Sequence, residues 1–181
     1  MIHTFITDKN LEGVIKEYFL NQVIGDKLYV LEDAEAAAFS LIKSKLNSRY
    51  DLTKLFPPIK DYADTTTYVK GDYSAKADVI YKSKIDNNTN HSPDTSPTQW
   101  EKSDPRDALL IRYCGIFTVY FALESINPRN ISEKLYENFE MAERWLNNVN
   151  KCVEHPDFPL ITIPGGMEVK GGSNAPTEHY Y

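Results

Sequence analysis

The residue types that carry most enzyme chemistry are few in this sequence and lie far apart. The histidines and cysteines of the 181-residue chain are His3, His91, His155, His179, Cys114 and Cys152. No two of the histidines have the spacing of a metal site, and neither cysteine has a histidine or a second cysteine at such a spacing. The sequence therefore predicts no bound metal and no cofactor.

The motifs of nucleophilic and nucleotide chemistry are also missing. The chain has no Gly-x-Ser-x-Gly, no phosphate-binding P-loop and no dinucleotide-binding glycine fingerprint. Its carboxylates are spread over predicted helix faces, so no acid–base pair stands out. Cys114 lies in an apolar helical pattern, which raises the pKa of a thiol and makes it a poor nucleophile. We expect a structural or binding protein and not an enzyme; a catalytic site assembled from distant residues is the alternative.

The amino-acid composition and net charge limit the classes of molecule that this chain is expected to bind. Apolar residues make up 41% of the chain and charged residues 25%, which is enough for a globular core. The net charge is −6 and no cluster of Lys and Arg stands out, which argues against binding through nucleic-acid phosphates. The 12 tyrosines suit either interfaces or a tyrosine-rich core. The first ten residues lack the pattern of a secretory signal peptide, so we expect synthesis in the cytoplasm and free thiols.

Residues 104–126 are predicted to form the central helix, against which the other elements of the fold pack. Asp104 is a good N-cap, Pro105 suits the first helical position, and Asp107 suits the first turn. The following apolar residues form one stripe at helical spacing with a second beside it: Leu109, Tyr113, Ile116, Tyr120 and Leu123, then Leu110, Phe117 and Phe121. A helix that is apolar nearly all round is buried on nearly all sides.

This central helix is expected to meet a neighbouring subunit, through Leu109, Tyr113, Ile116 and Tyr120. A membrane span is not expected, because charged residues interrupt the apolar run. Further helices are predicted from Asp8 to Gly25, from Glu32 to Tyr50 after a short apolar connector at 28–31, and from about Ile131 to Cys152 after an Asn130–Glu133 start.

Residues 61–103 differ from the rest of the chain. Helical periodicity disappears, and β-prone pieces at 66–69 and 79–81 are followed by a polar run at 86–98. We therefore predict a mainly α fold: a helical body at 1–60 and 104–155, a small β-rich insertion at 61–103, and an extended C-terminal arm at 156–181. The arm's candidate contacts are Leu160, Ile161, Ile163, Tyr180 and Tyr181.

Three short motifs carry a family resemblance. Leu46-Asn47-Ser48-Arg49-Tyr50-Asp51-Leu52 ends one helix and precedes Pro57-Pro58, Arg112-Tyr113 lies on the apolar helix, and Ala142-Glu143-Arg144-Trp145-Leu146 lies on the last helix. Over residues 33–58 and 104–152 the chain resembles the head–tail adaptor, or connector, proteins of tailed bacteriophages. It departs from that pattern in its N-terminal region and its long insertion.

The insertion has its own resemblance. Tyr68-Val69-Lys70-Gly71-Asp72, then Asp78-Val79-Ile80-Tyr81-Lys82, then Pro93, Pro97 and Trp100 look like the small β modules that bind chitin or other carbohydrates. Exposed aromatics in such modules stack on sugar rings. The aromatics available for that role here, or for the core of the module, are Tyr62, Tyr68, Tyr73, Tyr81 and Trp100.

The connector resemblance implies a structural virion protein located at the head–tail interface and assembled in the host cytoplasm. Its partners would be the portal protein, tail or further neck proteins, and itself, in a ring that the family makes twelvefold. Genome DNA would pass through the channel without specific binding, and no membrane would be involved. The alternative implied by the insertion is a glycan-binding accessory protein that acts through residues 61–103.

Overall fold

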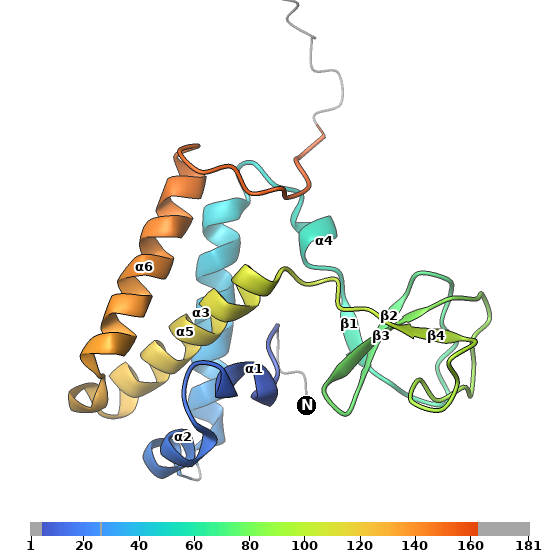
Figure 1. Cartoon of the computed structure of the whole chain (residues 1–181), viewed down its shortest axis with the longest axis horizontal. Helices are drawn as coiled ribbons and strands as arrows, with labels where there is room; N and C mark the ends of the chain where they lie inside the picture. Colours follow the sequence, from blue (N-terminus) through green and yellow to red (C-terminus); the bar gives the residue numbers. More distant parts are fainter. Residues whose placement is uncertain (1–4, 26, 163–181) are drawn as a thin grey trace, which may run out of the picture.

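Two parts make up the molecule, a helical body and a small sheet beside it (Figure 1). The computed structural model describes residues 5–25 and 27–162. The helices of these residues are α1 (Asp8–Glu12), α2 (Glu17–Ile24), α3 (Leu28–Leu46), α4 (Leu52–Leu55), α5 (Ala108–Ile126), the 3-10 turn η1 (Pro128–Asn130) and α6 (Glu133–Asn150). In Figure 1, α5 crosses the body next to α3 and α6, and α1 and α2 cover its lower end.

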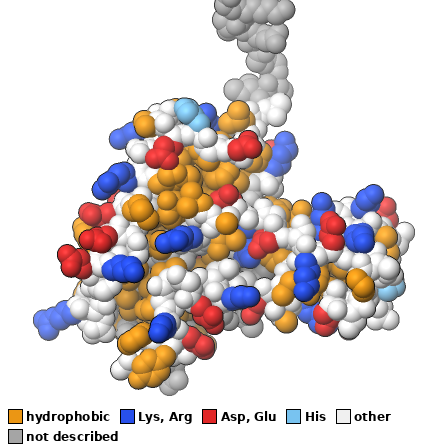
Figure 2. Space-filling model, viewed as in Figure 1, with side chains coloured by type: hydrophobic (Ala, Val, Ile, Leu, Met, Phe, Trp, Pro, Cys, Tyr) orange, Lys and Arg blue, Asp and Glu red, His pale blue; other side chains and the backbone are white. Residues whose placement is uncertain are grey.

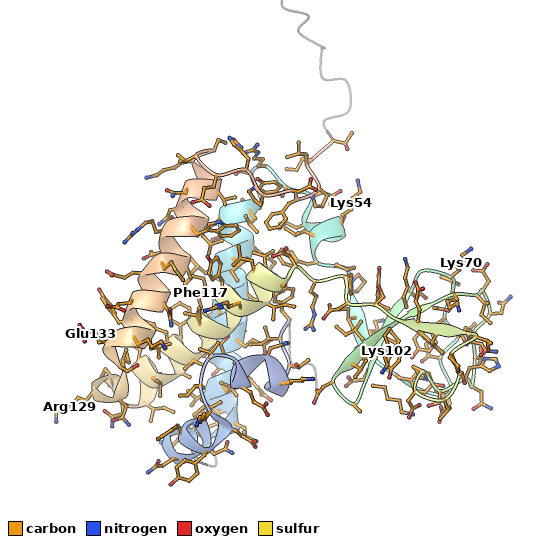
Figure 3. The ribbon with its side chains drawn as sticks, in the orientation of Figure 1. Lys54, Lys70, Lys102, Phe117, Arg129 and Glu133 are labelled. Atoms are coloured by element: carbon orange, nitrogen blue, oxygen red, sulfur yellow. The ribbon has the colours of Figure 1, made fainter. Side chains whose placement is uncertain are left out.

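The central position predicted for the 104–126 stretch is confirmed, but its start is not. The helix begins at Ala108, and the Asp107 carboxylate caps it by accepting bonds from the amides of Leu109 and Leu110, both at 2.9 Å. Asp104 does not cap the helix, because its carboxylate instead binds the Arg106 guanidinium. Phe117 lies in the middle of the bundle (Figure 3), with its ring edge-on to Phe139 of α6 at 5.4 Å.

The predicted helix from Asp8 to Gly25 is two short helices. The chain breaks after α1 at Gly13, a residue that costs about 1 kcal/mol in a helix interior. Val14 and Ile15 then pack against the core, and a Cβ added to Gly115 of α5 would lie 3.2 Å from a Val14 methyl. Gly25 ends α2 at φ +56°, so the predicted stop is confirmed.

The ends of the other two long helices, α3 and α6, also differ from those predicted. The apolar run at 28–31, predicted as a connector, forms the first turn of α3, which ends at Leu46 and not at Tyr50. At the start of α6, the Ser132 hydroxyl accepts a bond from the Leu135 amide at 3.2 Å, so Ser132 is the cap and Asn130 belongs to η1. Serine at an N-cap satisfies an amide that the helix itself leaves without a partner.

The insertion is a mixed four-stranded sheet of β1 (Ile59–Asp61), β2 (Tyr73–Lys76), β3 (Val79–Ser83) and β4 (Trp100–Lys102), in that order. β1 pairs parallel to β2, whereas β2–β3 and β3–β4 are antiparallel. Ala77 and Asp78 join β2 to β3 at φ +49° and +61°, the backbone of a type I′ hairpin turn.

The predicted mainly α class is wrong. The structure is 48% helical and 13% β, an α and β mixture. Of the β-prone pieces predicted at 66–69 and 79–81, only the second is a strand, β3, whereas the first contributes a single bridge between Tyr68 and Asn88. The four-residue β2 and the three-residue strands β1 and β4 were not predicted. Strands of three residues such as these are too short to show the alternation from which a strand is recognised.

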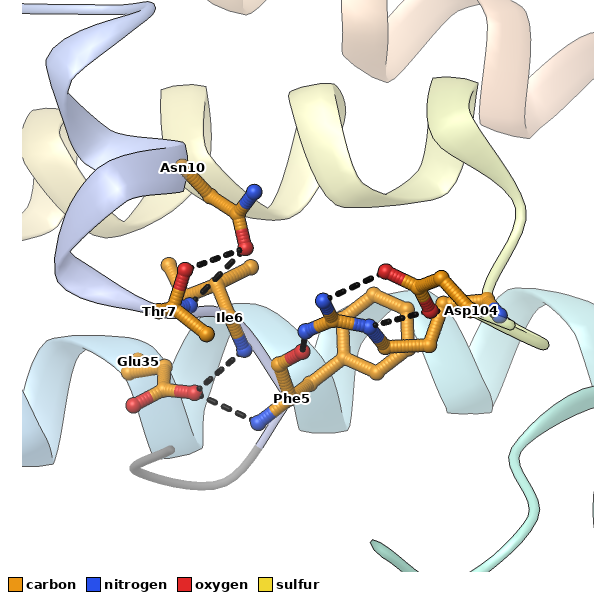
Figure 4. Close-up of polar contacts among 7 residues, drawn as sticks. Phe5, Ile6, Thr7, Asn10, Glu35 and Asp104 are labelled. Carbon is orange, nitrogen blue, oxygen red and sulfur yellow. Dashed lines mark hydrogen bonds and ion pairs between the residues drawn. The ribbon is translucent and has the colours of Figure 1, made fainter. Parts of the chain in front are cut away.

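The first described residues are fastened inside the body by two charged side chains (Figure 4). The carboxylate of Glu35 in α3 accepts bonds from the amides of Phe5 and Ile6 at 2.6 and 3.1 Å. Arg106 Nη1 donates to the Phe5 carbonyl at 2.5 Å, while the same guanidinium binds Asp104. The Phe5 ring packs on Phe39 and Phe56, so this N-terminal segment belongs to the core.

The segment after α6 returns to the end of α3. The amide of Asp51 donates to the Pro159 carbonyl at 2.8 Å, and the amide of Ile161 donates to the Arg49 carbonyl at 3.0 Å. Part of the predicted arm is therefore attached to its own body, up to Thr162. Ile163, Tyr180 and Tyr181, predicted as contacts, lie outside the described residues.

Candidate functional site

The residues of α5 that were predicted to contact another subunit lie mostly inside this one. Tyr113 and Ile116 are buried, and the ring of Tyr120 stacks on Phe139 at a centroid distance of 4.0 Å. Leu109, at the first turn of α5, is exposed. Because α1 and α2 cover the face that the sequence left open, α5 offers little surface for a ring contact.

Aromatic residues from four separate segments meet at the end of the body where α3 and α6 finish. The Tyr113 ring of α5 lies 5.2 Å from Trp145 of α6, and Trp145 lies 6.4 Å from Phe158. Phe158 is in turn edge-on to Tyr50, at 5.4 Å. These four rings join the ends of the helices to the returning segment.

One exposed apolar surface continues from these rings. Leu160 and Ile161 are 56% and 43% exposed, next to the half-buried Phe158 and Trp145. We call Trp145, Phe158, Leu160 and Ile161 the terminal patch. Figure 2 shows hydrophobic side chains gathered over this upper part of the body.

A second exposed apolar surface lies at the opposite end, where α2 meets the start of α3. Tyr18, Phe19, Leu28 and Tyr29 are 71%, 54%, 64% and 61% exposed, and the rings of Tyr18 and Phe19 lie 5.5 Å apart. We call these four residues the corner patch. Hydrophobic side chains protrude there at the bottom of Figure 2.

The sequence reasoning missed the corner patch. It predicted one helix from Asp8 to Gly25, with Tyr18 and Phe19 at helical spacing, and a connector at 28–31. A usable signal was present: Tyr18, Phe19 and Leu20 are consecutive, and successive helical residues are 100° apart, so a short helix cannot bury all three. In the structure Leu20 is buried and the two aromatic residues face outward.

Two hollows adjoin the corner patch. A cavity of about 770 Å³ between α2, the end of α5 and the start of α6 has a lining without charged residues, which includes Ile15, Phe19 and Leu123 and the amides of Gln22 and Asn127. A second of about 550 Å³ lies between α1, α2 and the start of α3, and its lining includes Leu28. The exposed rings therefore stand on an uneven surface with depressions on both sides.

The aromatics of the inserted module form its core. Tyr68, Tyr81 and Trp100 are buried, Trp100 to 2% exposure, and the Trp100 indole donates to the His91 carbonyl at 2.7 Å. Tyr62 and Tyr73 are half-buried, and the ammonium groups of Lys76 and Lys82 lie over their rings at 5.6 and 5.8 Å. Of the five aromatics proposed for stacking on a sugar, Tyr68, Tyr81 and Trp100 are therefore occupied in the module core.

Polar contacts fix the loop that covers these rings. The Asp94 carboxylate accepts bonds from the Lys76 ammonium and the Ser92 hydroxyl, both at 2.8 Å, and these bonds lower the pKa of Asp94 to about 2. Lys76 also donates to Ser92. Burial and the nearby Asp64 carboxylate raise the pKa of Tyr62 to about 12. Each of these groups keeps its usual charge state at neutral pH, so the cluster has a structural role and is not poised for proton transfer.

The described residues offer little for catalysis. Residues 5–25 and 27–162 contain no group of three or more His, Cys, Asp or Glu side chains placed to hold a metal ion. Burial raises the pKa of the Cys114 thiol, which therefore stays protonated inside α5. Among the described helices, α5 is long and apolar enough for a membrane span by length and composition, yet more than half of that stretch is buried in the bundle.

Comparisons with known proteins give no information on the function of this chain. The chain matches no protein-family model, no curated protein and no solved structure.

Proposed function

We propose that this chain is a structural protein of a bacteriophage neck, in which copies form a ring that joins the portal to the tail and extends the DNA channel. One observation carries the proposal: the three connector-like motifs, far apart in sequence, meet in space. Tyr50, Tyr113 and Trp145 each come from one motif, and their rings join through Phe158. The cluster brings the three motifs together at one end of the body.

The surface of α6 supports the same proposal. Glu133, Glu137, Glu140 and Glu143 are exposed along this helix, and Glu133 points away from the bundle in Figure 3. Lys134 and Arg144 offset part of that charge, which leaves the face acidic. A channel wall with net negative charge repels DNA phosphates and lets the duplex slide without adhering.

Exposed apolar surface that could serve ring contacts includes the predicted Leu160 and Ile161, but little of α5. A ring subunit needs apolar area on its sides, and the corner and terminal patches supply exposed large apolar side chains, as do Leu109, Tyr136, Met141 and Val153 elsewhere on the body. The buried residues of α5 supply the rigidity of the subunit instead of its contacts.

The test is native mass spectrometry of the purified protein, alone and with the portal protein encoded by the same genome. The proposal predicts a ring-stoichiometric complex with the portal, which negative-stain electron microscopy should show beneath the portal ring. The absence of any complex with the portal, over a range of salt and protein concentrations, would refute it.

A further inference from the structure

The cavity between α2, the end of α5 and the start of α6, at the lower end of the body in Figure 1, has the size of a small-molecule site. Its volume is about 770 Å³, and pockets that bind small molecules measure roughly 300–1,000 Å³. Leu123 and Leu135 line it as buried residues, whereas Phe19 lines it while 54% exposed. The cavity therefore has an apolar inner wall and an opening to solvent.

The core of the body holds the walls of this cavity in place. Val14 lines the cavity and packs against α5, where a Cβ added to Gly115 would lie 3.2 Å from a Val14 methyl. Glycine at position 115 therefore allows a close contact that a larger residue would obstruct. Leu123 and Leu135 also belong to the core cluster, so the fold itself sets the shape of the cavity.

The lining selects against charged ligands. The described residues that line the cavity are all uncharged. Moving an ion from water into such a site without a counter-charge is costly, whereas a neutral molecule loses much less hydration. The site therefore favours a neutral ligand with an apolar body.

Two polar residues of the lining offer hydrogen-bond donors. Asn127 Oδ1 accepts from the Arg129 amide at 3.2 Å and caps η1. Ser132 Oγ accepts from the Leu135 amide at 3.2 Å and caps α6. With these oxygens engaged, the Asn127 amino group and the Ser132 hydroxyl hydrogen remain, and both are donors. A ligand that pairs with them needs an acceptor oxygen.

We propose that this cavity binds an uncharged small molecule with an apolar body and an acceptor oxygen, such as the carbonyl of an ester, ketone or amide. The apolar body packs on Leu123, Leu135 and Phe19, and the oxygen accepts from Asn127 or Ser132. The lining comes from one chain, so the inference does not depend on the ring function proposed above.

The experiment titrates the full chain with prodan, an uncharged naphthalene fluorophore that carries one ketone carbonyl. We expect saturable one-to-one binding with a blue shift of the emission, and nuclear Overhauser effects from the probe to the methyl groups of Leu123 and Leu135. Anilinonaphthalene sulfonate, an anionic fluorophore of similar size, should bind about tenfold more weakly or not at all.

Two variants test the walls, each with a matched control. Phe19→Ser should weaken prodan binding about fivefold, whereas Tyr18→Ser, which removes an exposed ring outside the lining, should leave it unchanged. Asn127→Asp keeps the capping oxygen but replaces the donors with a charge, so it should weaken binding about tenfold. The same change at Asn150, an exposed residue at the far end of α6, should have no effect.

All four substituted side chains are exposed, so the variants should fold, and their melting temperatures verify it. Three results would overturn the inference and leave the neck function untouched. They are prodan binding that does not saturate at one site, sulfonate binding as tight as that of prodan, and an equal loss of binding in Tyr18→Ser and Phe19→Ser.

Discussion

Removing the Glu35 carboxylate should loosen the N-terminal segment and destabilise the whole helical body. Glu35 is 1% exposed and accepts the amides of Phe5 and Ile6, so its replacement by Leu leaves both amides without that acceptor. A buried donor without a partner costs about 1–3 kcal/mol. For two amides, we expect Glu35→Leu to lower the free energy of unfolding by about 3–5 kcal/mol.

Glu35→Gln should have a smaller effect, because it keeps a side-chain oxygen that can accept hydrogen bonds and loses only the charge. A bond to a charged acceptor contributes about 1.5–3 kcal/mol, against about 0.5–1.5 for a neutral one. Relief from burying a charge offsets part of this difference, so we expect a loss of about 1–2 kcal/mol. The order should therefore be wild type, Gln variant, Leu variant.

Urea unfolding followed by Trp145 fluorescence and circular dichroism measures both changes. The control is Glu32→Gln, an exposed carboxylate one turn earlier on α3, which should stay within about 0.5 kcal/mol of the wild type. If Glu35→Leu were as stable as that control, the charged fastening of the N-terminal segment would contribute nothing, and the reasoning would be refuted.

The remaining predictions concern the inserted module. The Asp94 carboxyl, followed by NMR, should titrate near pH 2, and Lys76→Met should raise its pKa toward 3.8. The stabilisation from the Lys76 contact is complete above pH 3.8 and is lost as the pH falls through 2. A pKa of Asp94 that stays near 2 in the Lys76→Met variant would contradict this prediction. Ala77→Gly should raise the thermal stability of the sheet by about 1 kcal/mol, because only glycine adopts φ +49° without strain; a loss would contradict the turn assignment. Replacing residues 59–103 with a five-residue Gly-Ser linker should keep the helical body folded, since the two cores share no residue and the sheet edges to be joined lie about 14 Å apart. A variant without a cooperative Trp145 transition would refute that independence.

Much of the helical body could be predicted, because long helices leave a periodic pattern. Of the predicted α3 stripe, Ala34, Ala38, Ile42 and Leu46 are buried, whereas Leu41 is half-buried and Ala37 is exposed. The predicted helix ends were less accurate than the helices themselves, because side chains compete for the capping position. Asp104 was predicted as the N-cap of α5, but in the structure its carboxylate binds the Arg106 guanidinium. Such a contact depends on where the N-terminal segment lies, which local sequence does not show.

The candidate surfaces were harder to predict than the helices. The all-round apolar sequence of α5 indicates that every face of the helix is covered, but it does not identify the covering elements. In the structure α1 and α2 of the same chain cover the face that was left open. Once those helices occupy that face, Tyr18 and Phe19 have no core left to enter. The exposed surfaces are therefore consequences of tertiary packing, beyond the reach of periodicity.

The position of the sheet within the chain has a consequence for how the protein folds as it is synthesised. All four strands lie between residues 59 and 102, so the sheet's pairings are complete before α5 has left the ribosome. The contact of Phe5 with Arg106 joins residues 101 positions apart, and α3 must likewise wait for α5. The smaller core can thus form first, and Phe5 is bound only after Arg106 has been synthesised.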